Sequence, residues 1–257
     1  MARRNREVGF VKSCVLASAL VAGLALPAQA DDKKLTLSAT TYIATDYMFR
    51  GVSNTNQNPE ATAEFDVLYG IFYAGMWGSN TAYGENIEID YYAGLTPKWG
   101  PVTFNFAALW YSYPGSPGGI ETFDVSYLEL KAAASYTTGQ WTFGIGNWWS
   151  PDFFQSFGKS DAIEGNIAYA FKGKLFNFFS PTVSGIFGYQ AFEDVAADYT
   201  YWNAGLTLGF MDHYSFDVRY WDTDYSKTDC SIYSANADSL GRNNCDARAV
   251  GTLKAVF

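Results

Sequence analysis

The stretch Ile87-Glu-Ile-Asp-Tyr-Tyr-Ala-Gly-Leu95 alternates between two kinds of side chain. Its odd-numbered positions are apolar or aromatic, whereas its even-numbered positions include Glu88 and Asp90. Successive side chains of a β-strand point to opposite faces of the sheet, so this pattern predicts a strand with one apolar and one charged face. Its length is close to the ~9–11 residues with which a tilted strand crosses a bilayer.

The same alternation recurs along the chain and predicts an all-β fold. No apolar run after Ala30 approaches the ~20 residues that a membrane-spanning helix needs. Twelve segments alternate with period two, and we expect the shortest ones to extend through less regular residues at their ends. These segments are residues 35–49, 61–69, 71–79, 87–95, 102–112, 124–136, 141–149, 163–169, 183–189, 202–210, 216–220 and 247–257.

The connections between these segments alternate between long and short. The long ones are residues 51–60, 80–86, 113–123, 150–162, 190–201 and 221–246. A β-sandwich gives no reason for this rhythm, whereas a transmembrane β-barrel has short periplasmic turns and long outer loops. We therefore expect an antiparallel up-and-down barrel of about twelve strands over residues 31–257, closed without an edge. One connection, 170–182, should be short and is not.

The first thirty residues have the layout of a cleavable secretory signal. A basic start with Arg3, Arg4 and Arg6 precedes an apolar run, and the segment ends in Ala28-Gln-Ala30. We expect cleavage after Ala30 and export to the outer membrane of a Gram-negative bacterium. The segment holds three more positive than negative charges, so the mature chain carries −12 instead of −9. This acidity argues against nucleic acid as a partner.

Aromatic residues are abundant and gather near the predicted strand ends. The chain has 19 Tyr, 20 Phe and 8 Trp. We expect outward-facing rings to form the interfacial girdles of a barrel in outer-membrane lipid. The predicted members are Tyr47, Phe49, Tyr69, Trp77, Tyr91, Trp110, Trp141, Trp149, Tyr169, Trp202 and Tyr220. The terminal Phe257 ends an alternating strand, which is typical of the signal bound by outer-membrane assembly machinery.

The stretch Ile43-Ala-Thr-Asp-Tyr-Met-Phe-Arg-Gly51 continues the alternation of the first segment. Its parity predicts that Tyr47 and Phe49 face lipid and that Asp46 and Arg50 point into the barrel. Four residues on one strand span roughly 13 Å, so the two charges are too far apart to pair directly. Each should find water or a partner on another strand.

The same parity assigns a set of ionisable side chains to the lumen. Eight are acidic and five are basic, so a conducting lumen should prefer small cations weakly. A barrel of twelve strands is narrow, however, and the same charges could pair across it and close it. The predicted lumen residues are Asp46, Arg50, Glu64, Asp66, Glu88, Asp90, Glu129, Lys131, Glu164, Asp217, Arg219, Arg248 and Lys254.

Several stretches of the mature chain resemble sequences of the TorF family of proteobacterial porins. The resemblance implies an outer-membrane barrel and a pore, and it names no substrate. An insertion at residues 227–244 and the pair Trp148-Trp149 depart from the pattern. The matching phrases are Asp46-Tyr-Met-Phe-Arg-Gly51 with Ser53, Phe72-Tyr-Ala-Gly-Met-Trp-Gly-Ser-Asn80, Glu88-Ile-Asp-Tyr-Tyr-Ala-Gly94, Tyr113-Pro-Gly115, Ser150-Pro-Asp-Phe153, Glu164-Gly-Asn166 and Asp222-Thr-Asp224.

The sequence does not favour an enzyme or a metal site. The single histidine, His213, is expected in a short periplasmic turn, and no GxSxG element accompanies it. We expect no cofactor, and we expect passive diffusion of small hydrophilic solutes. Cys230 and Cys245 form an even pair in an exported chain, which predicts a disulfide. The alternative is a structural or adhesive barrel that uses the loop 221–246.

Overall fold

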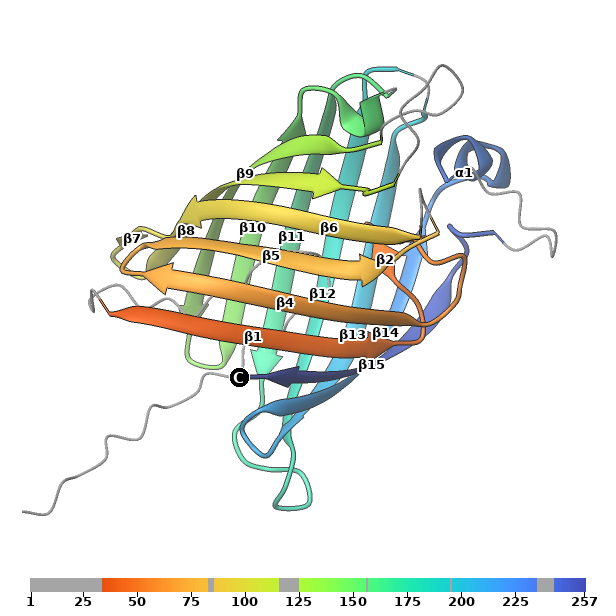
Figure 1. Cartoon of the computed structure of the whole chain (residues 1–257). Helices are drawn as coiled ribbons and strands as arrows, with labels where there is room; N and C mark the ends of the chain where they lie inside the picture. Colours follow the sequence, from red (N-terminus) through yellow and green to blue (C-terminus); the bar gives the residue numbers. More distant parts are fainter. Residues whose placement is uncertain (1–33, 83–85, 116–124, 156, 195, 235–242) are drawn as a thin grey trace, which may run out of the picture.

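The computed structural model describes residues 34–82, 86–115, 125–155, 157–194, 196–234 and 243–257. The predicted signal, residues 1–30, lies outside this part, as does Asp124. Twelve long antiparallel strands close into a barrel, as predicted (Figure 1). They are β1 (Leu35–Ala44), β4 (Glu60–Tyr69), β5 (Phe72–Asn80), β6 (Ile87–Leu95), β8 (Val102–Ser112), β9 (Tyr127–Thr138), β10 (Trp141–Ser150), β11 (Ser160–Ala170), β12 (Ser180–Phe192), β13 (Tyr199–Phe210), β14 (Tyr214–Thr223) and β15 (Arg248–Val256).

Each long strand pairs with its neighbours along the chain, and one further pairing, between β1 and β15, closes the ring. β1 pairs with β15, where Ile43 lies opposite Leu253, and it also pairs with β4. The short β7 (Lys98–Trp99) lies in the connection between β6 and β8, and β6 and β8 pair directly. Closure gives the backbone donors and acceptors of every long strand partners on both sides, which a sheet in lipid requires.

The two faces of the sheet differ as the alternation predicts. The outer face is exposed and apolar, with Phe65, Ile145 and Val218 among its residues. The inner face holds buried ionisable side chains, including Glu88 and Arg219. Hydrocarbon accepts the first set, whereas the second set needs polar partners that only the barrel interior offers.

The two ends of the barrel carry different connections. We call the end that holds both described chain ends the turn end, and the opposite end the loop end (Figure 1). The loop end carries the 3₁₀ turn η1 (Phe153–Gln155) and the helix α1 (Lys227–Tyr233). Among the described residues, no helix is long and apolar enough to span a membrane. His213 lies exposed in the turn between β13 and β14, as expected.

The predicted first strand is wrong beyond Ala44. β1 ends there, and residues 45–59 turn into the barrel as a hairpin with the short strands β2 (Met48–Phe49) and β3 (Val52–Ser53). Alternation continues through this stretch, but it now belongs to a hairpin inside the lumen. The three short predicted segments do extend at their ends, into β11, β12 and β14.

Three predicted girdle residues are also placed wrongly. Tyr47 and Phe49 are only 6% and 4% exposed, because the hairpin carries them into the interior. Trp77 is buried on the inner face of β5, where its indole N–H donates to the Tyr42 hydroxyl at 3.3 Å. Most of the other predicted girdle residues are exposed on the outer wall: Tyr69, Tyr91, Trp110, Trp141, Trp149 and Tyr220.

Candidate functional site

The candidate site is the hairpin of residues 45–59, which we call the plug, together with the inner wall around it. Its two strands pair Met48 with Ser53, and the backbone N–H of Asn54 donates to the carbonyl of Tyr47 at 2.7 Å. Arg50 and Gly51 form the tip, with φ of +47° and +84°. Positive φ at both central residues is the geometry of a two-residue hairpin turn.

Glycine at the tip is required by space as well as by conformation. A Cβ on Gly51 would lie 2.4 Å from the Thr223 side chain and 2.9 Å from that of Tyr201. The tip therefore approaches β13 and β14 closely, and a side chain at this position would push the plug away from the wall.

Arg50 joins the plug to the far wall of the barrel. Its guanidinium donates to both carboxylate oxygens of Glu129 on β9, at 2.8 and 2.9 Å, and to the Gln190 side chain on β12 at 2.7 Å. It also lies over the rings of Phe49 and Trp148, at 4.6 and 5.8 Å from their centroids. Arg50 is 1% exposed and Glu129 is 0% exposed, so this bidentate pair is shielded from water.

The electrostatics of this pair keep Arg50 charged. Burial by itself lowers the pKa of Arg50, but the nearby Glu129 carboxylate outweighs burial and raises the pKa well above its ordinary value. A second donor, the Tyr111 hydroxyl, reaches Glu129 at 3.0 Å. The Glu129 carboxylate thus accepts hydrogen bonds from both Arg50 and Tyr111.

A second ion pair holds the base of the plug. Arg248 on β15 donates to Asp46 at 2.7 Å. Asp46 also accepts from the hydroxyls of Ser53 and Thr55, at 2.6 and 2.8 Å, and these bonds fold the segment back on itself. Asp46 and Arg50 therefore each have a partner elsewhere, as their separation predicts.

Aromatic contacts fill the space between the plug and the wall. Tyr47 packs on Trp77 with ring centroids 5.4 Å apart, and Phe49 packs on Tyr111 at 6.0 Å. The Tyr47 hydroxyl donates to Glu88 at 3.1 Å. Burial, and then the charge of Glu88, raise the pKa of Tyr47 well above its usual value, so the phenol stays a donor.

The fit between the plug and the wall is tight. A cavity of about 10 Å³ lies where Asp46 and Met48 face β14 and β15. This volume is about that of one water molecule. Asp46 and Met48 therefore lie close to this part of the wall.

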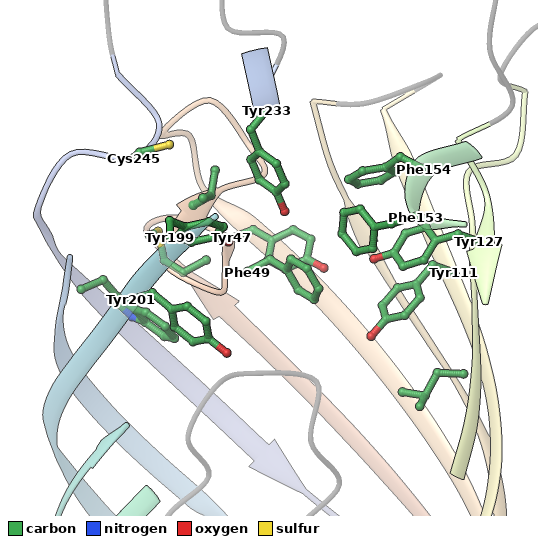
Figure 2. Close-up of a cluster of buried hydrophobic side chains, with 14 of the residues drawn as sticks. Tyr47, Phe49, Tyr111, Tyr127, Phe153, Phe154, Tyr199, Tyr201, Tyr233 and Cys245 are labelled. Atoms are coloured by element: carbon green, nitrogen blue, oxygen red, sulfur yellow. The ribbon is translucent and has the colours of Figure 1, made fainter. Parts of the chain in front are cut away.

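Above the plug, aromatic side chains from several loops pack together across the mouth (Figure 2). Tyr233 projects from α1 and lies 5.9 Å from Phe157 and 5.5 Å from Phe192. The Phe153 ring is tilted against that of Tyr127, with centroids 4.5 Å apart. The disulfide between Cys230 and Cys245 links α1 to the chain just before β15, as predicted, and so holds Tyr233 in place.

Glycines on the inner wall allow long side chains to lie flat along it. Tyr92 covers Gly75, its partner across the β5–β6 pair, where a Cβ would lie 2.5 Å from the ring. The Tyr92 hydroxyl thereby reaches Asp66 on β4, two strands away, at 2.7 Å. Tyr201 covers Gly188 in the same way and reaches Glu164 on β11 at 3.1 Å.

The interior towards the turn end is more accessible than the plugged half. Its inward side chains are mostly small and polar, and they remain half-buried or exposed. Examples are Thr103, Asn105, Ser135, Thr142, Asn166 and Ser184. The described plug and aromatic side chains thus fill the lumen towards the loop end, whereas the turn end is partly accessible to solvent.

The predicted lumen residues all lie on the inner face or in the plug. Ion pairs join Arg50 to Glu129, Arg219 to Asp217 and Arg248 to Asp46. The others with inward positions are Glu64, Asp66, Glu88, Asp90, Lys131, Glu164 and Lys254. Sequence reasoning missed the uncharged members, such as Gln190 and Tyr111. Tyr111 lies on the inward parity of the predicted segment 102–112, and extending the segment 183–189 by one residue would have included Gln190.

Comparison with solved structures places the fold among porin-like barrels. The KdgM porin matches with a TM-score of 0.55 and 8% identity, over 86% of this chain and 99% of that chain. This likeness shows a shared fold. Two further matches are weaker. OmpT of Vibrio cholerae has a TM-score of 0.41 and 11% identity, over 87% of this chain and 97% of that chain. OmpF of Salmonella typhi has a TM-score of 0.40 and 10% identity, over 88% of this chain and 98% of that chain.

No curated protein matches the chain in sequence. A family model does match, over residues 28–257, and its description is "Bacterial protein of unknown function (Gcw_chp)". The match covers the entire barrel and the plug. The chain therefore belongs to the Gcw_chp family of bacterial proteins.

Proposed function

We propose that this protein is an outer-membrane channel for passive diffusion of small hydrophilic solutes. One observation carries the proposal: a closed barrel presents apolar residues outside and ionisable ones inside. The interior holds more acids than bases, which favours a weak cation preference. The fold shared with a protein named as a porin agrees with this function. No step of it requires a cofactor or enzymatic chemistry.

The proposed location follows from the same features. The turn end would face the periplasm and the loop end would face outward, after a leader is cleaved behind Ala30. Phe257 would be part of the signal that the assembly machinery binds. In the folded barrel its backbone exchanges hydrogen bonds with Ala39, at 2.9 and 2.8 Å. The TorF name remains an expectation from the sequence phrases.

The plug sets the size of what can pass. Arg50, Asp46 and the aromatic packing hold it across the loop-end half, so the resting conductance should be small. We propose that passage depends on local displacement of the plug from the wall.

Planar-bilayer recording of the purified, refolded protein tests this function. The native chain should show small, rare openings. A variant in which a Gly-Ser linker replaces residues 46–58 should show larger and steadier openings, because the obstruction is gone. Heat-modifiable migration on gels would first establish that both variants fold. Silent membranes with both folded proteins would refute the channel.

The aromatic packing at the mouth also favours a second candidate, a structural or adhesive barrel that uses the loop 221–246. In the described part of this loop, the disulfide between Cys230 and Cys245 joins α1 to the chain before β15, and aromatic side chains pack beneath α1. Replacing that loop distinguishes the two functions. Surface binding would disappear in an adhesin, whereas conductance would persist in a channel.

A further inference from the structure

The connection between β11 and β12 is an ordered projection at the turn end, and we call residues 171–179 the finger. Leu175 and Phe179 exchange two backbone hydrogen bonds, of 2.8 and 2.9 Å. Phe176 and Asn177 form the tip, with φ of +52° and +56°. Figure 1 shows the finger extending below the neighbouring strands. It accounts for the long connection that breaks the alternation of loop lengths.

The tip of the finger is apolar and strained. Phe176 is 83% exposed, and Leu175 and Phe178 are exposed beside it. Turns with positive φ at both central residues favour Asn and Gly, so phenylalanine at this position is unfavourable by conformation and by hydration. A surrounding that removes the ring from water would stabilise this arrangement.

The base of the finger continues a belt of aromatic rings on the outer wall. On one side the contacts run from Trp141 to Tyr169 (4.7 Å) and from Tyr169 to Phe171 (4.9 Å). On the other side they run from Phe178 to Phe210 (5.8 Å), Phe210 to Tyr214 (5.7 Å) and Tyr214 to Phe257 (6.3 Å). Such belts lie at the membrane–water interface, which places the base of the finger there.

Charge is divided between the two ends of the barrel. Lys172 and Lys174 are exposed on the finger. The other exposed charges at the turn end of the described chain are Lys34, Lys98 and Asp212. At the loop end, exposed acids outnumber Lys159 and Lys227, and they are Asp152, Asp161, Glu193, Asp194, Asp198, Asp224 and Asp246. The turn end is therefore suited to an anionic surface, although the protein as a whole is acidic.

We propose that the finger binds anionic phospholipid in the leaflet that surrounds the turn end. Phe176 and Leu175 contact lipid at the boundary between headgroups and acyl chains, while Lys172 and Lys174 contact headgroup phosphates. Apolar rings beside lysines are the combination found in segments that lie in a membrane interface. The inference rests on the membrane location in the proposed function, but not on conduction.

A fluorophore on Asn177→Cys tests the proposal, since Cys230 and Cys245 are joined and do not react. The barrel is reconstituted into phosphatidylcholine vesicles with and without phosphatidylglycerol. Brominated lipid should quench the tip label, and phosphatidylglycerol should increase this quenching and protect the label from aqueous acrylamide. Each lysine near an anionic surface should change tip occupancy by up to about fivefold.

Variants separate the two parts of the contact. Lys172→Gln with Lys174→Gln should abolish the effect of phosphatidylglycerol, and Phe176→Ser should reduce lipid quenching in both vesicles. Lys159→Gln with Lys227→Gln, at the other end, is the matched control and should change nothing. A label equally open to acrylamide in both lipids would overturn the proposal, even without any variant. Protection only in whole outer-membrane preparations would also overturn it and indicate a protein partner.

Conductance measured on the same reconstituted protein keeps the two proposals apart. A barrel that does not conduct but protects the label with lipid would refute the channel function and support lipid binding by the finger. A barrel that conducts while its label is exposed to water would support the channel function and refute lipid binding by the finger. If lipid quenches none of the wall tryptophans, the membrane location itself fails.

Discussion

Arg50 is the residue on which the closed interior depends most. Its carbon chain crosses the lumen from the plug, and its guanidinium is the charged partner of the fully buried Glu129. A buried ion pair is a weak source of net stability, because desolvation offsets most of the attraction. Removing one partner is a different matter, since the remaining charge is left without compensation.

We expect Arg50→Met to lower the free energy of unfolding by about 3–5 kcal/mol, because Glu129 is left buried and unpaired. Urea unfolding in detergent, followed by tryptophan fluorescence, measures the change. The double variant Arg50→Met, Glu129→Gln should recover part of the loss, since the orphan charge is gone. Lys159→Met breaks an exposed ion pair with Glu193 and should leave stability unchanged. Equal loss in the single and double variants would contradict this role for Arg50.

Pairs of neighbouring strands are tied to a third strand by side chains that lie over glycine. Tyr92 over Gly75 spans from β6 to β4, and Tyr201 over Gly188 spans from β13 to β11. In each case the missing Cβ gives the ring a flat path to an acid two strands away. These ties make the wall stiffer than backbone pairing alone.

We expect Gly75→Ala to destabilise the barrel by about 1–3 kcal/mol, because the new methyl group forces the Tyr92 ring off the wall. In a Tyr92→Ala background the same change should cost much less, and the double-mutant cycle measures the difference. Gly165→Ala is the matched control: it faces outward, and its Cβ would meet only the Phe187 carbonyl, at 3.9 Å. A cycle without coupling would contradict the packing argument.

The loop that carries α1 is stabilised by its disulfide. Fifteen positions separate Cys230 from Cys245, so the cross-link should contribute about 3 kcal/mol by restricting the unfolded chain. Replacing both cysteines by serine should lower the unfolding free energy by that amount and expose the loop to proteases. Conductance should not change, because Arg50 and Asp46 hold the plug to strands of the wall without the disulfide. A large rise in conductance would show instead that this loop closes the lumen.

The whole barrel is electrically asymmetric, with an acidic interior on the accessible side. Lys254 on β15 is half-buried and interacts electrostatically with Glu64, Asp66 and Asp217. We expect Lys254→Gln to shift the reversal potential in a KCl gradient further towards cation preference, since one positive charge leaves the lumen. Acidification should act in the opposite sense, because protonation removes negative charge from the interior. Lys159→Gln, outside the barrel, should have no effect, and an anion-preferring native protein would contradict the prediction.

The wall of the barrel could be predicted from the chain alone. Alternation at residues 87–95 is a local pattern, and lipid rejects charge so strongly that each face has one possible environment. Strand ends were less certain: Val102–Ser112 matches its predicted bounds, whereas β12 is much longer than predicted, because its outer residues alternate less regularly. The ionisable residues expected in the lumen were inferred from alternating positions along each strand, without knowing which side chains they contact.

The plug could not be predicted, because Tyr47 and Phe49 fit the alternation of a longer wall strand equally well. Its position depends on contacts between residues far apart in the chain: Arg50 pairs with a residue 79 positions away, and Asp46 with one 202 positions away. Trp77 also points inward, on the same face of β5 as Tyr73 and Ser79, and its indole N–H donates to Tyr42, 35 positions away. Alternation determined which residues form the wall, because it is a pattern among residues adjacent in the chain. What fills the lumen was decided only by closure of the barrel, because closure brings the far wall within reach of Arg50.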